Sequence, residues 1–173
     1  MRDFFKKFFF PPLTVNWETY DFSAAHQKLN LGCGNDYREG WQNWDISDTV
    51  HSDARINVEK DVFPADDNFF DVLYANGVIE QIRENEGLLH CMNECHRVLK
   101  KAGNAVFVVP DSRFSITFND PHDVRHFVHA TFRYFCVGTK AYERYGRFYG
   151  YLPWSTYTAS TDKRGLMTVV LTK

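Results

Sequence analysis

The stretch Lys28-Leu29-Asn30-Leu31-Gly32-Cys33-Gly34, followed by Trp44-Asp45-Ile46-Ser47, decides the fold. Residues 29–31 have the pattern of a short buried strand, and two glycines bracket the tight turn that leaves it. Glycines there let the backbone approach a ligand without an intervening Cβ atom. A second strand-like run ends in Asp45, whose carboxylate suits the two hydroxyls of a ribose. The pattern predicts a nucleotide-cofactor loop, with a purely structural turn as the alternative.

The length and composition indicate a single soluble globular domain. Of the 173 residues, 44% are hydrophobic and 24% are charged, which is enough for one buried core. We expect residues 1–173 to form one domain. Within it we expect a lead-in segment at 1–27, a cofactor-binding half at 28–111 and a substrate-side half at 112–173.

Charge is distributed unevenly along the chain. The net charge of −2 does not favour nucleic acid as a partner. Residues 1–112 hold 11 Lys and Arg against 18 Asp and Glu, whereas residues 113–173 hold 9 against 4. An acidic front half suits a cationic cofactor and a basic back half suits an anionic or polar substrate. Simple solvation of two surfaces is the alternative.

Neither the cysteines nor the apolar runs indicate an exported or membrane protein. The four cysteines form no disulfide framework and no two-plus-two metal pattern, so we expect free core cysteines and no metal. No apolar run approaches the roughly 20 residues that a membrane helix needs. The Phe-rich start, residues 1–10, contains two lysines and is followed by no small-residue cleavage site. The sequence therefore predicts a reduced, cytoplasmic protein.

Strand-like and helix-like segments alternate along the front half. Apolar runs predict strands at 28–32, 41–46, 54–58, 69–75 and 105–109. An apolar stripe spaced i, i+4, i+7 and i+11 predicts a helix over 84–100, which Gly103 is placed to stop. This alternation indicates a parallel sheet covered on both faces.

Three further segments complete the expected fold. Only six residues, 35–40, separate the first two strands, so the crossover helix between them is expected to shrink to about a turn. The pattern at 124–136 predicts a helix. The runs at 151–160 and 166–172, joined by a polar turn, predict a terminal hairpin.

Several motifs in order resemble the small "type 11" branch of the class I S-adenosylmethionine-dependent methyltransferases. The segments that carry this resemblance are Leu29-Asn30-Leu31-Gly32-Cys33-Gly34, Asp45, Asp61-Val62-Phe63-Pro64, Phe70-Asp71-Val72, Val78-Ile79-Glu80 and His96-Arg97-Val98-Leu99-Lys100. The resemblance spans roughly residues 28–111. It implies an α/β fold, a Rossmann-like, doubly wound and mostly parallel seven-stranded sheet with a C-terminal antiparallel hairpin.

The resemblance also implies S-adenosyl-L-methionine as cofactor and a set of residues around it. The turn at Leu31, Gly32, Cys33 and Gly34 would face the methionine part of the cofactor. Asp45, with Ile46 beside it, would hold the ribose. Asp61 and Val62 would border the adenine, and Asn76 and Gly77 would line the floor beneath the sulfonium.

Three residues depart from the family pattern. Asn30 stands where the family usually has an acid that helps to hold the loop and the amino group of the cofactor. Asp36 stands near the position of the third loop glycine, and Gln81 replaces a common histidine. Each departure bears on cofactor affinity or activity.

Candidate catalytic residues lie in the segment Asp120-Pro121-His122-Asp123-Val124-Arg125-His126-Phe127. Methyl transfer needs an aligned nucleophile and, for some acceptors, removal of a proton. Histidine titrates near neutrality and a neighbouring aspartate can orient it, so we select His122, Asp123 and His126. The alternative is that His122 caps a helix and His126 is structural. For Glu80 we expect a structural role at the strand end.

These observations predict a methyltransferase that acts on a small-molecule or glycan-like acceptor. A cofactor-binding protein without catalysis, acting through partners, and an RNA methyltransferase are the alternatives. A nicotinamide-dependent oxidoreductase is disfavoured, because the loop lacks the third glycine of the G-x-G-x-x-G spacing. The sequence predicts no oligomeric state.

Overall fold

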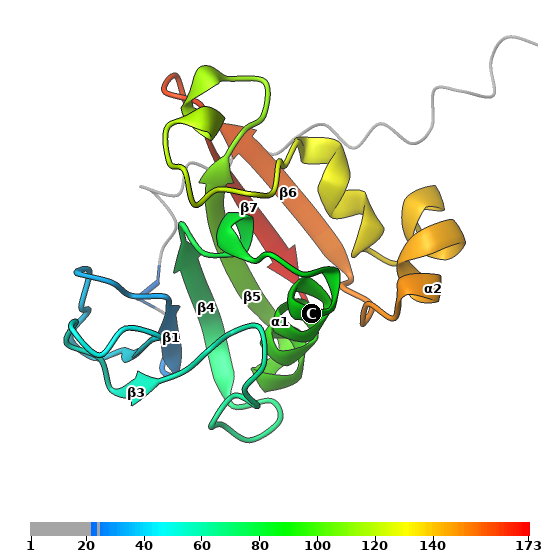
Figure 1. Ribbon diagram of the computed structural model, residues 1–173. Coiled ribbons are helices and arrows are strands. Elements are labelled where there is room, and N and C mark those ends of the chain that lie inside the picture. The colour runs from blue at the N-terminus through cyan, green and yellow to red at the C-terminus, as the bar shows by residue number, and fades with distance from the viewer. Residues whose placement is uncertain (1–21, 24) are drawn as a thin grey trace, which may run out of the picture.

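The computed structural model describes residues 22, 23 and 25–173 (Figure 1). The Phe-rich start and most of the expected lead-in segment, 1–27, lie outside the described residues. In the described part, seven strands form one sheet in the order β3-β2-β1-β4-β5-β7-β6. The strands are β1 (Lys28–Leu31), β2 (Gln42–Asp45), β3 (Ala54–Arg55), β4 (Phe70–Asn76), β5 (Leu99–Pro110), β6 (Thr156–Thr161) and β7 (Leu166–Thr172).

The strand directions confirm the predicted fold class. Strands β1 to β5 pair in parallel with their neighbours, whereas β7 is antiparallel to both β5 and β6. The terminal hairpin is therefore present, although β6 begins at Thr156 rather than at residue 151. Strand β3 has only two residues, shorter than the expected 54–58.

Alternation along the central strand β4 divides the core into two clusters. Leu73 and Ala75 belong to the larger cluster, and Val72 and Tyr74 belong to the smaller one. All four are at most 2% exposed, so β4 is buried on both faces, as its apolar sequence predicts. The larger cluster holds most of the apolar side chains and supports the helical side of the domain.

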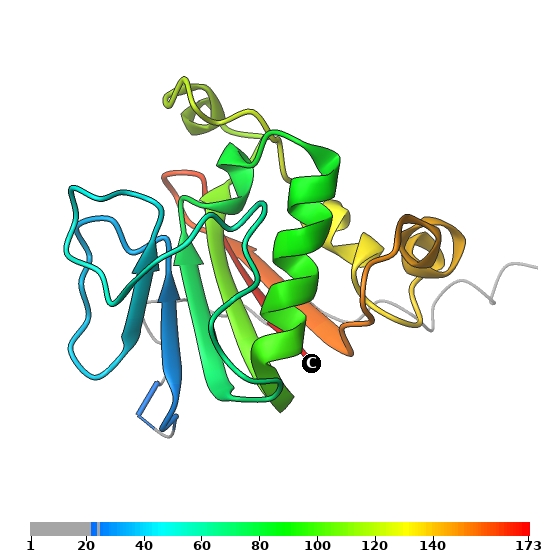
Figure 2. The same ribbon diagram turned by 60° about the horizontal axis from the view of Figure 1, so that its bottom comes forward.

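The long helix α1 (Asn85–Val98) covers the larger cluster (Figure 2). Its apolar stripe, Leu88, Met92 and Cys95, is buried as predicted. The remaining helical segments are short: 3₁₀ helices at Ile79–Gln81, Ser115–Phe118 and His129–Tyr134, a π-helix at Tyr142–Gly146 and α2 (Arg147–Tyr149). In the described part of the chain, no helical residue contributes to the smaller cluster, which packs against Phe22, Ala25, Trp41 and Leu166.

The prediction that Gly103 stops the long helix is wrong. The helix ends at Val98, and Leu99 already has an extended backbone at the start of β5. The register between β4 and β5 shifts after Phe70, and Ala102 takes up the irregularity with φ of 61°. A Cβ atom on Gly103 would lie 2.8 Å from the Lys100 carbonyl oxygen and 3.0 Å from that of Asp71. Close backbone approach therefore explains this glycine.

The connection between β1 and β2 is short, as expected, but it contains only turns and not the single helical turn that was predicted. Buried asparagines hold it in place. Asn43 accepts a hydrogen bond from the Arg38 backbone N–H (2.9 Å) and donates to the Trp41 carbonyl oxygen (3.1 Å). Asn30 donates to the carbonyl oxygen of Asp36 at 2.6 Å and to Asn43 at 3.2 Å. Asn30 is 2% exposed, so its amide stabilises the shortened loop from within the fold.

Candidate functional site

The glycine turn after β1 is tied directly to the end of β2. The backbone N–H groups of Gly32 and Cys33 both donate to the Trp44 carbonyl oxygen, at 2.8 and 3.0 Å. Gly32 has φ of 65°, and a Cβ atom there would lie 2.4 Å from Cγ2 of Val78. The turn therefore packs against the segment that follows β4.

Gly34 has a different environment within the same turn. Its φ is 51°, and a Cβ atom built on it meets nothing within 4 Å. Leu31 and Cys33, in contrast, are buried, and the Cys33 thiol faces the His51 carbonyl oxygen at 3.7 Å. These two side chains support the turn from inside, and Gly34 presents open backbone to the outside.

Asp45 lies next to this open backbone. Its carboxylate accepts hydrogen bonds from the backbone N–H of Gly34 and from that of Ser47, both at 2.8 Å. Asp45 is only partly buried, so the carboxylate keeps lone pairs available for a ligand. The structure thus brings together the glycine turn and the acid that the sequence pairs with it.

Exposed apolar and flexible residues complete this edge. Ile46 is 55% exposed and Val62 is 73% exposed, which is unusual for aliphatic side chains on a folded domain. The Asp61 carboxylate accepts a bond from the Asn57 backbone N–H at 2.8 Å and so stabilises its own loop. At the end of β4, Asn76 and Gly77 are both exposed, and Gly77 has φ of 72°.

The segment that follows β5, residues 112–128, arches over the carboxyl ends of the parallel strands (Figure 2). The prediction of a helix over 124–136 is wrong, because helical structure begins only at His129. Backbone bonds hold the earlier part in place: the N–H groups of Val124 and Arg125 both donate to the Glu80 carbonyl oxygen, at 3.0 and 2.9 Å. The Arg125 guanidinium also donates to the Ile82 carbonyl oxygen at 2.5 Å. Pairing with this strand-end loop replaces the hydrogen bonds of a helix.

The three predicted catalytic residues lie on this arching segment but do not form the expected pair. His122 Nδ1 lies 3.3 Å from Oδ1 of Asp120, so Asp120 rather than Asp123 is the partner of this imidazole. Asp123 instead faces the Gln81 amide at 3.5 Å. His126 is exposed, and its Nδ1 lies 3.4 Å from the Thr117 hydroxyl. The order of Asp120 and Asp123 in the sequence does not indicate which of the two pairs with His122.

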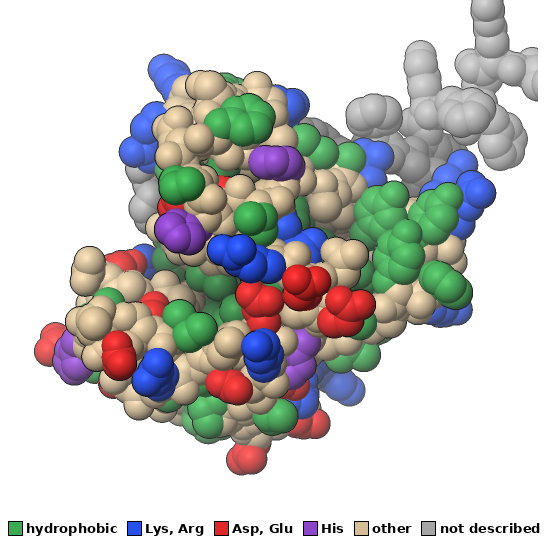
Figure 3. Space-filling view, viewed as in Figure 1, with side chains coloured by type: hydrophobic (Ala, Val, Ile, Leu, Met, Phe, Trp, Pro, Cys, Tyr) green, Lys and Arg blue, Asp and Glu red, His purple; other side chains and the backbone are tan. Residues whose placement is uncertain are grey.

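Glu80 is the most unusual titratable residue of this edge. It is 3% exposed, and its Oε2 has no hydrogen-bond partner. Burial, reinforced by the charge of Asp123, raises the pKa of the Glu80 carboxyl to about 8. Burial and the nearby Asp120 also raise the pKa of Asp123. Side chains of acidic residues gather beside the amino end of α1 on this face (Figure 3).

An ion pair between the buried Asp111 and the exposed Arg113 lies at the start of the arching segment. Asp111, 0% exposed, accepts hydrogen bonds from the Arg113 guanidinium (2.5 Å) and the Thr161 hydroxyl (2.7 Å). Burial opposes ionisation of Asp111, but these hydrogen bonds outweigh it and lower its pKa to about 2. The Thr161 bond, together with the bond from the Asp111 backbone N–H to the Gly165 carbonyl oxygen, joins the end of β5 to the β6–β7 hairpin and thereby sets where the segment leaves the sheet.

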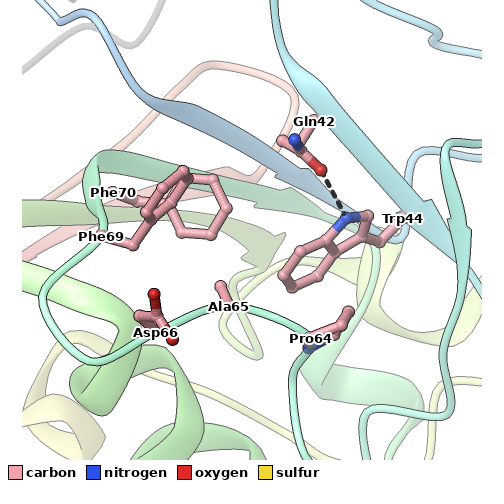
Figure 4. A pocket seen from close by; sticks show the side chains of 7 residues that line it. All are labelled: Gln42, Trp44, Pro64, Ala65, Asp66, Phe69 and Phe70. Atoms are coloured by element: carbon pink, nitrogen blue, oxygen red, sulfur yellow. Dashed lines mark hydrogen bonds between the residues drawn. The ribbon is translucent and has the colours of Figure 1, made fainter.

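A separate cavity lies at the opposite edge of the sheet. It has a volume of about 340 Å³, and its walls include the first residues of β2 and β4 (Figure 4). Its lining residues are Gln42, Trp44, Pro64, Ala65, Asp66, Phe69 and Phe70. Since these are amino ends of the strands, the cavity is distinct from the glycine turn and the arching segment.

Two further expectations concern metals and membranes. Among residues 22, 23 and 25–173, no three His, Cys, Asp or Glu side chains are placed to hold a metal ion. No described helix is long and apolar enough to cross a bilayer. The four cysteines are all buried and unpaired, as predicted.

The topology and this edge define a Rossmann-like protein with a nucleotide-type cofactor site at the carboxyl ends of its strands. Residues 29–107 match the family model described as "Methyltransferase domain". Over this part of its length the chain is therefore similar to methyltransferase domains, and its fold is that of class I S-adenosylmethionine-dependent methyltransferases. The open backbone at Gly34, the partly exposed Asp45 and the exposed Ile46 and Val62 fit a ligand with polar and flat apolar parts.

Solved structures with this fold are distant in sequence. A SAM-dependent methyltransferase from Archaeoglobus fulgidus gives a TM-score of 0.66 at 12% identity, with 88% of each chain covered. A SAM-dependent methyltransferase from Methanosarcina mazei gives 0.55 at 11% identity, covering 85% of this chain and 92% of that chain. A chain from the complex of the Haloferax volcanii Trm112 methyltransferase activator with a methyltransferase gives 0.56 at 15% identity, covering 85% and 82%. No curated protein sequence matches the chain.

Proposed function

We propose that this protein is an S-adenosylmethionine-dependent methyltransferase. Its acceptor is a small molecule, glycan-like molecules included, that binds between the glycine turn and the arching segment. The observation that carries the proposal is the docking of residues 112–128 on the 3₁₀ helix Ile79–Gln81, which follows β4. Through the two backbone bonds to Glu80, this docking brings His122, Asp123 and His126 to the edge that holds Gly77. In open α/β sheets, ligands bind outside the carboxyl ends of the strands.

The proposed cofactor contacts follow from the exposed groups of this edge. Gly32 and Gly34, between the buried Leu31 and Cys33, would offer backbone to the methionine part, and Asp45 would accept hydrogen bonds from the ribose hydroxyls. Ile46 and Val62 would pack on the adenine, beside Asp61, and Asn76 with Gly77 would lie under the sulfonium. The bound cofactor supplies a methyl group activated by its positive sulfur.

We assign proton removal from the acceptor to the arching segment. His122 is the first candidate, because Asp120 fixes its Nδ1 and leaves Nε2 available as a base. His126 is the second candidate. It contacts the exposed Phe118, with 5.7 Å between the ring centroids. Asp123 lies between the two histidines in the chain, and their charges act on its carboxyl.

Calorimetry with S-adenosylhomocysteine and with NAD tests the cofactor part of the proposal. We expect binding of S-adenosylhomocysteine and none of NAD, and the reverse result would refute it. Incubation with methyl-labelled S-adenosylmethionine and pools of small amines, sugars and phenols then tests the acceptor class. Transfer to RNA but to no small molecule would favour the RNA methyltransferase, and cofactor binding without any transfer would favour the non-catalytic alternative.

The four unpaired cysteines support a reducing compartment such as the cytoplasm.

A further inference from the structure

The unpartnered carboxyl oxygen of Glu80 indicates a missing hydrogen-bond donor at the acceptor side of the site. A buried polar atom without a partner is rare in native folds, since it costs about 1–3 kcal/mol. The other carboxyl oxygen, Oε1, lies on the side of Gly77, 4.0 Å from where a Cβ atom would stand on that glycine. Glu80 therefore reaches toward the edge where the cofactor residues and the arching segment meet.

The charged groups around Glu80 are themselves mostly acidic. Asp123 and Asp120, from the arching segment, both act on the Glu80 carboxyl through their charges. His122 and His126 act on Asp123 in the opposite sense. Arg125 is nearby in the chain, but its guanidinium is bound to the carbonyl oxygens of residues 82 and 83 and to the Asn85 side chain. Backbone N–H groups of residues 78 and 80 oppose the rise in the Glu80 pKa.

A side-chain amide occupies the place of a donor between the two aspartates. The Gln81 Nε2 lies 3.5 Å from Asp120 and 3.5 Å from Asp123, at the outer limit of hydrogen bonding. Gln81 is exposed, so moving this amide aside costs little. A ligand with a stronger, charged donor would displace it and reach Glu80.

We propose that Glu80, together with Asp120 and Asp123, binds the ammonium group of the acceptor, so that the substrate is an amine. This inference rests on the proposed function and names its substrate class. An ammonium carries three N–H donors and one positive charge, which matches an unpartnered carboxyl oxygen with two further acids close enough to act on it. A metal ion is a poorer match, because the described residues offer no metal-ligating group of three. The exposed Phe118 and Val124, 74% and 43% exposed, offer apolar surface on the same segment.

Binding of an ammonium should also release a proton. With a pKa of about 8, the Glu80 carboxyl is mostly protonated at pH 7. A cation beside it favours the ionised form, so close to one proton leaves when the amine binds. The measured heat of binding then depends on the ionisation heat of the buffer, a signature that a merely structural glutamate would lack.

The test uses two matched pairs of probes, 2-phenylethylamine with 2-phenylethanol and glucosamine with glucose. Calorimetry is done on the full chain saturated with S-adenosylhomocysteine, at pH 7, in phosphate and in MOPS, which has no primary amine. We expect at least one amine to bind at least tenfold more tightly than its hydroxyl partner, with a heat that differs between the buffers. The Glu80→Gln variant should lose this preference and the buffer dependence. It should still fold, because glutamine resembles the protonated acid. The control variant Glu39→Gln, at an exposed acid of the β1–β2 connection, should behave like the parent.

The outcomes separate the inference from the proposed function. Equal affinity for amines and hydroxyl compounds, or no binding of either amine, would overturn the inference while S-adenosylhomocysteine binding upholds the function. Weaker S-adenosylhomocysteine binding in Glu80→Gln, with amine affinity unchanged, would mean that Glu80 meets the cofactor, and this too would overturn it. Absence of S-adenosylhomocysteine binding in the parent protein would refute the proposed function alone, because the amine titrations can be repeated without it.

Discussion

Replacing Gly34 with alanine should separate the stability of the glycine turn from its function. A Cβ atom at this position meets nothing within 4 Å, so the only cost to the fold is the left-handed backbone at φ of 51°. That conformation costs a non-glycine residue roughly 1–2 kcal/mol. We therefore expect the free energy of unfolding to fall by about that amount. Binding of S-adenosylhomocysteine should fall at least tenfold, because the methyl group stands where the cofactor needs open backbone.

Two other glycines provide matched comparisons for this experiment. Gly138 also has positive φ, 80°, and an open environment, but it is outside the proposed cofactor contacts, so Gly138→Ala should cost similar stability and leave binding intact. Gly32→Ala must also displace the Val78 side chain, and overpacking adds roughly 1–3 kcal/mol to the same strain. Urea unfolding measures the first effect and titration calorimetry the second. If Gly34→Ala binds S-adenosylhomocysteine as the parent does, the turn is purely structural and the proposed cofactor site is wrong.

Three further predictions concern acids and histidines of the same edge. Asp45→Ala should weaken S-adenosylmethionine binding by about 1–3 kcal/mol in calorimetry, since a charged acceptor is lost; unchanged affinity in a folded variant would contradict the ribose assignment. His122→Ala should slow single-turnover transfer roughly 10²–10⁴-fold and flatten its rise with pH, with cofactor binding intact, and the same result in His126→Ala instead would move the base there. The pKa of Asp111 is about 2 in the folded protein, below its ordinary 3.8, so its ionised form should contribute about 2 kcal/mol to the free energy of unfolding above pH 4, and this contribution should be lost as the pH falls toward 2. In urea unfolding, Asp111→Asn and the parent should therefore differ in stability at pH 7 and converge at pH 2. A difference that persists at pH 2 would refute the ion-pair account.

Hydrophobic patterning predicted the parallel half of the sheet and the stripe of α1, because these elements obey local periodicity. It failed at Gly103. This glycine is at a helix-stop position in the sequence, but in the structure it lies in an irregular part of β5, where its backbone packs close to the Asp71 carbonyl oxygen. It failed again at 124–136, where the apolar spacing is helical. There the backbone of Val124 and Arg125 bonds instead to Glu80, more than forty residues earlier. Long-range pairing of this kind overrides local preference and leaves no periodic signal.

The candidate site was predictable where a motif fixes position along one strand end, as with Gly34 and Asp45. The sequence could not predict that Asp120, and not Asp123, pairs with His122. Two acids three residues apart are equivalent in sequence and differ only in how the loop turns. The buried, unpartnered state of Glu80 was equally hidden. A glutamate is normally solvated or fully paired, and only the packed structure shows that this one is buried with its Oε2 unpartnered.

The position of β7 inside the sheet has a consequence for synthesis of the protein. The strand lies between β5 and β6, so the ribosome must reach residue 172 before the sheet can close. Until then β5 presents a row of unpaired backbone groups, the template on which other chains aggregate. A chain truncated before β7 should therefore aggregate, although residues 29–107, which match the methyltransferase model, are complete in it.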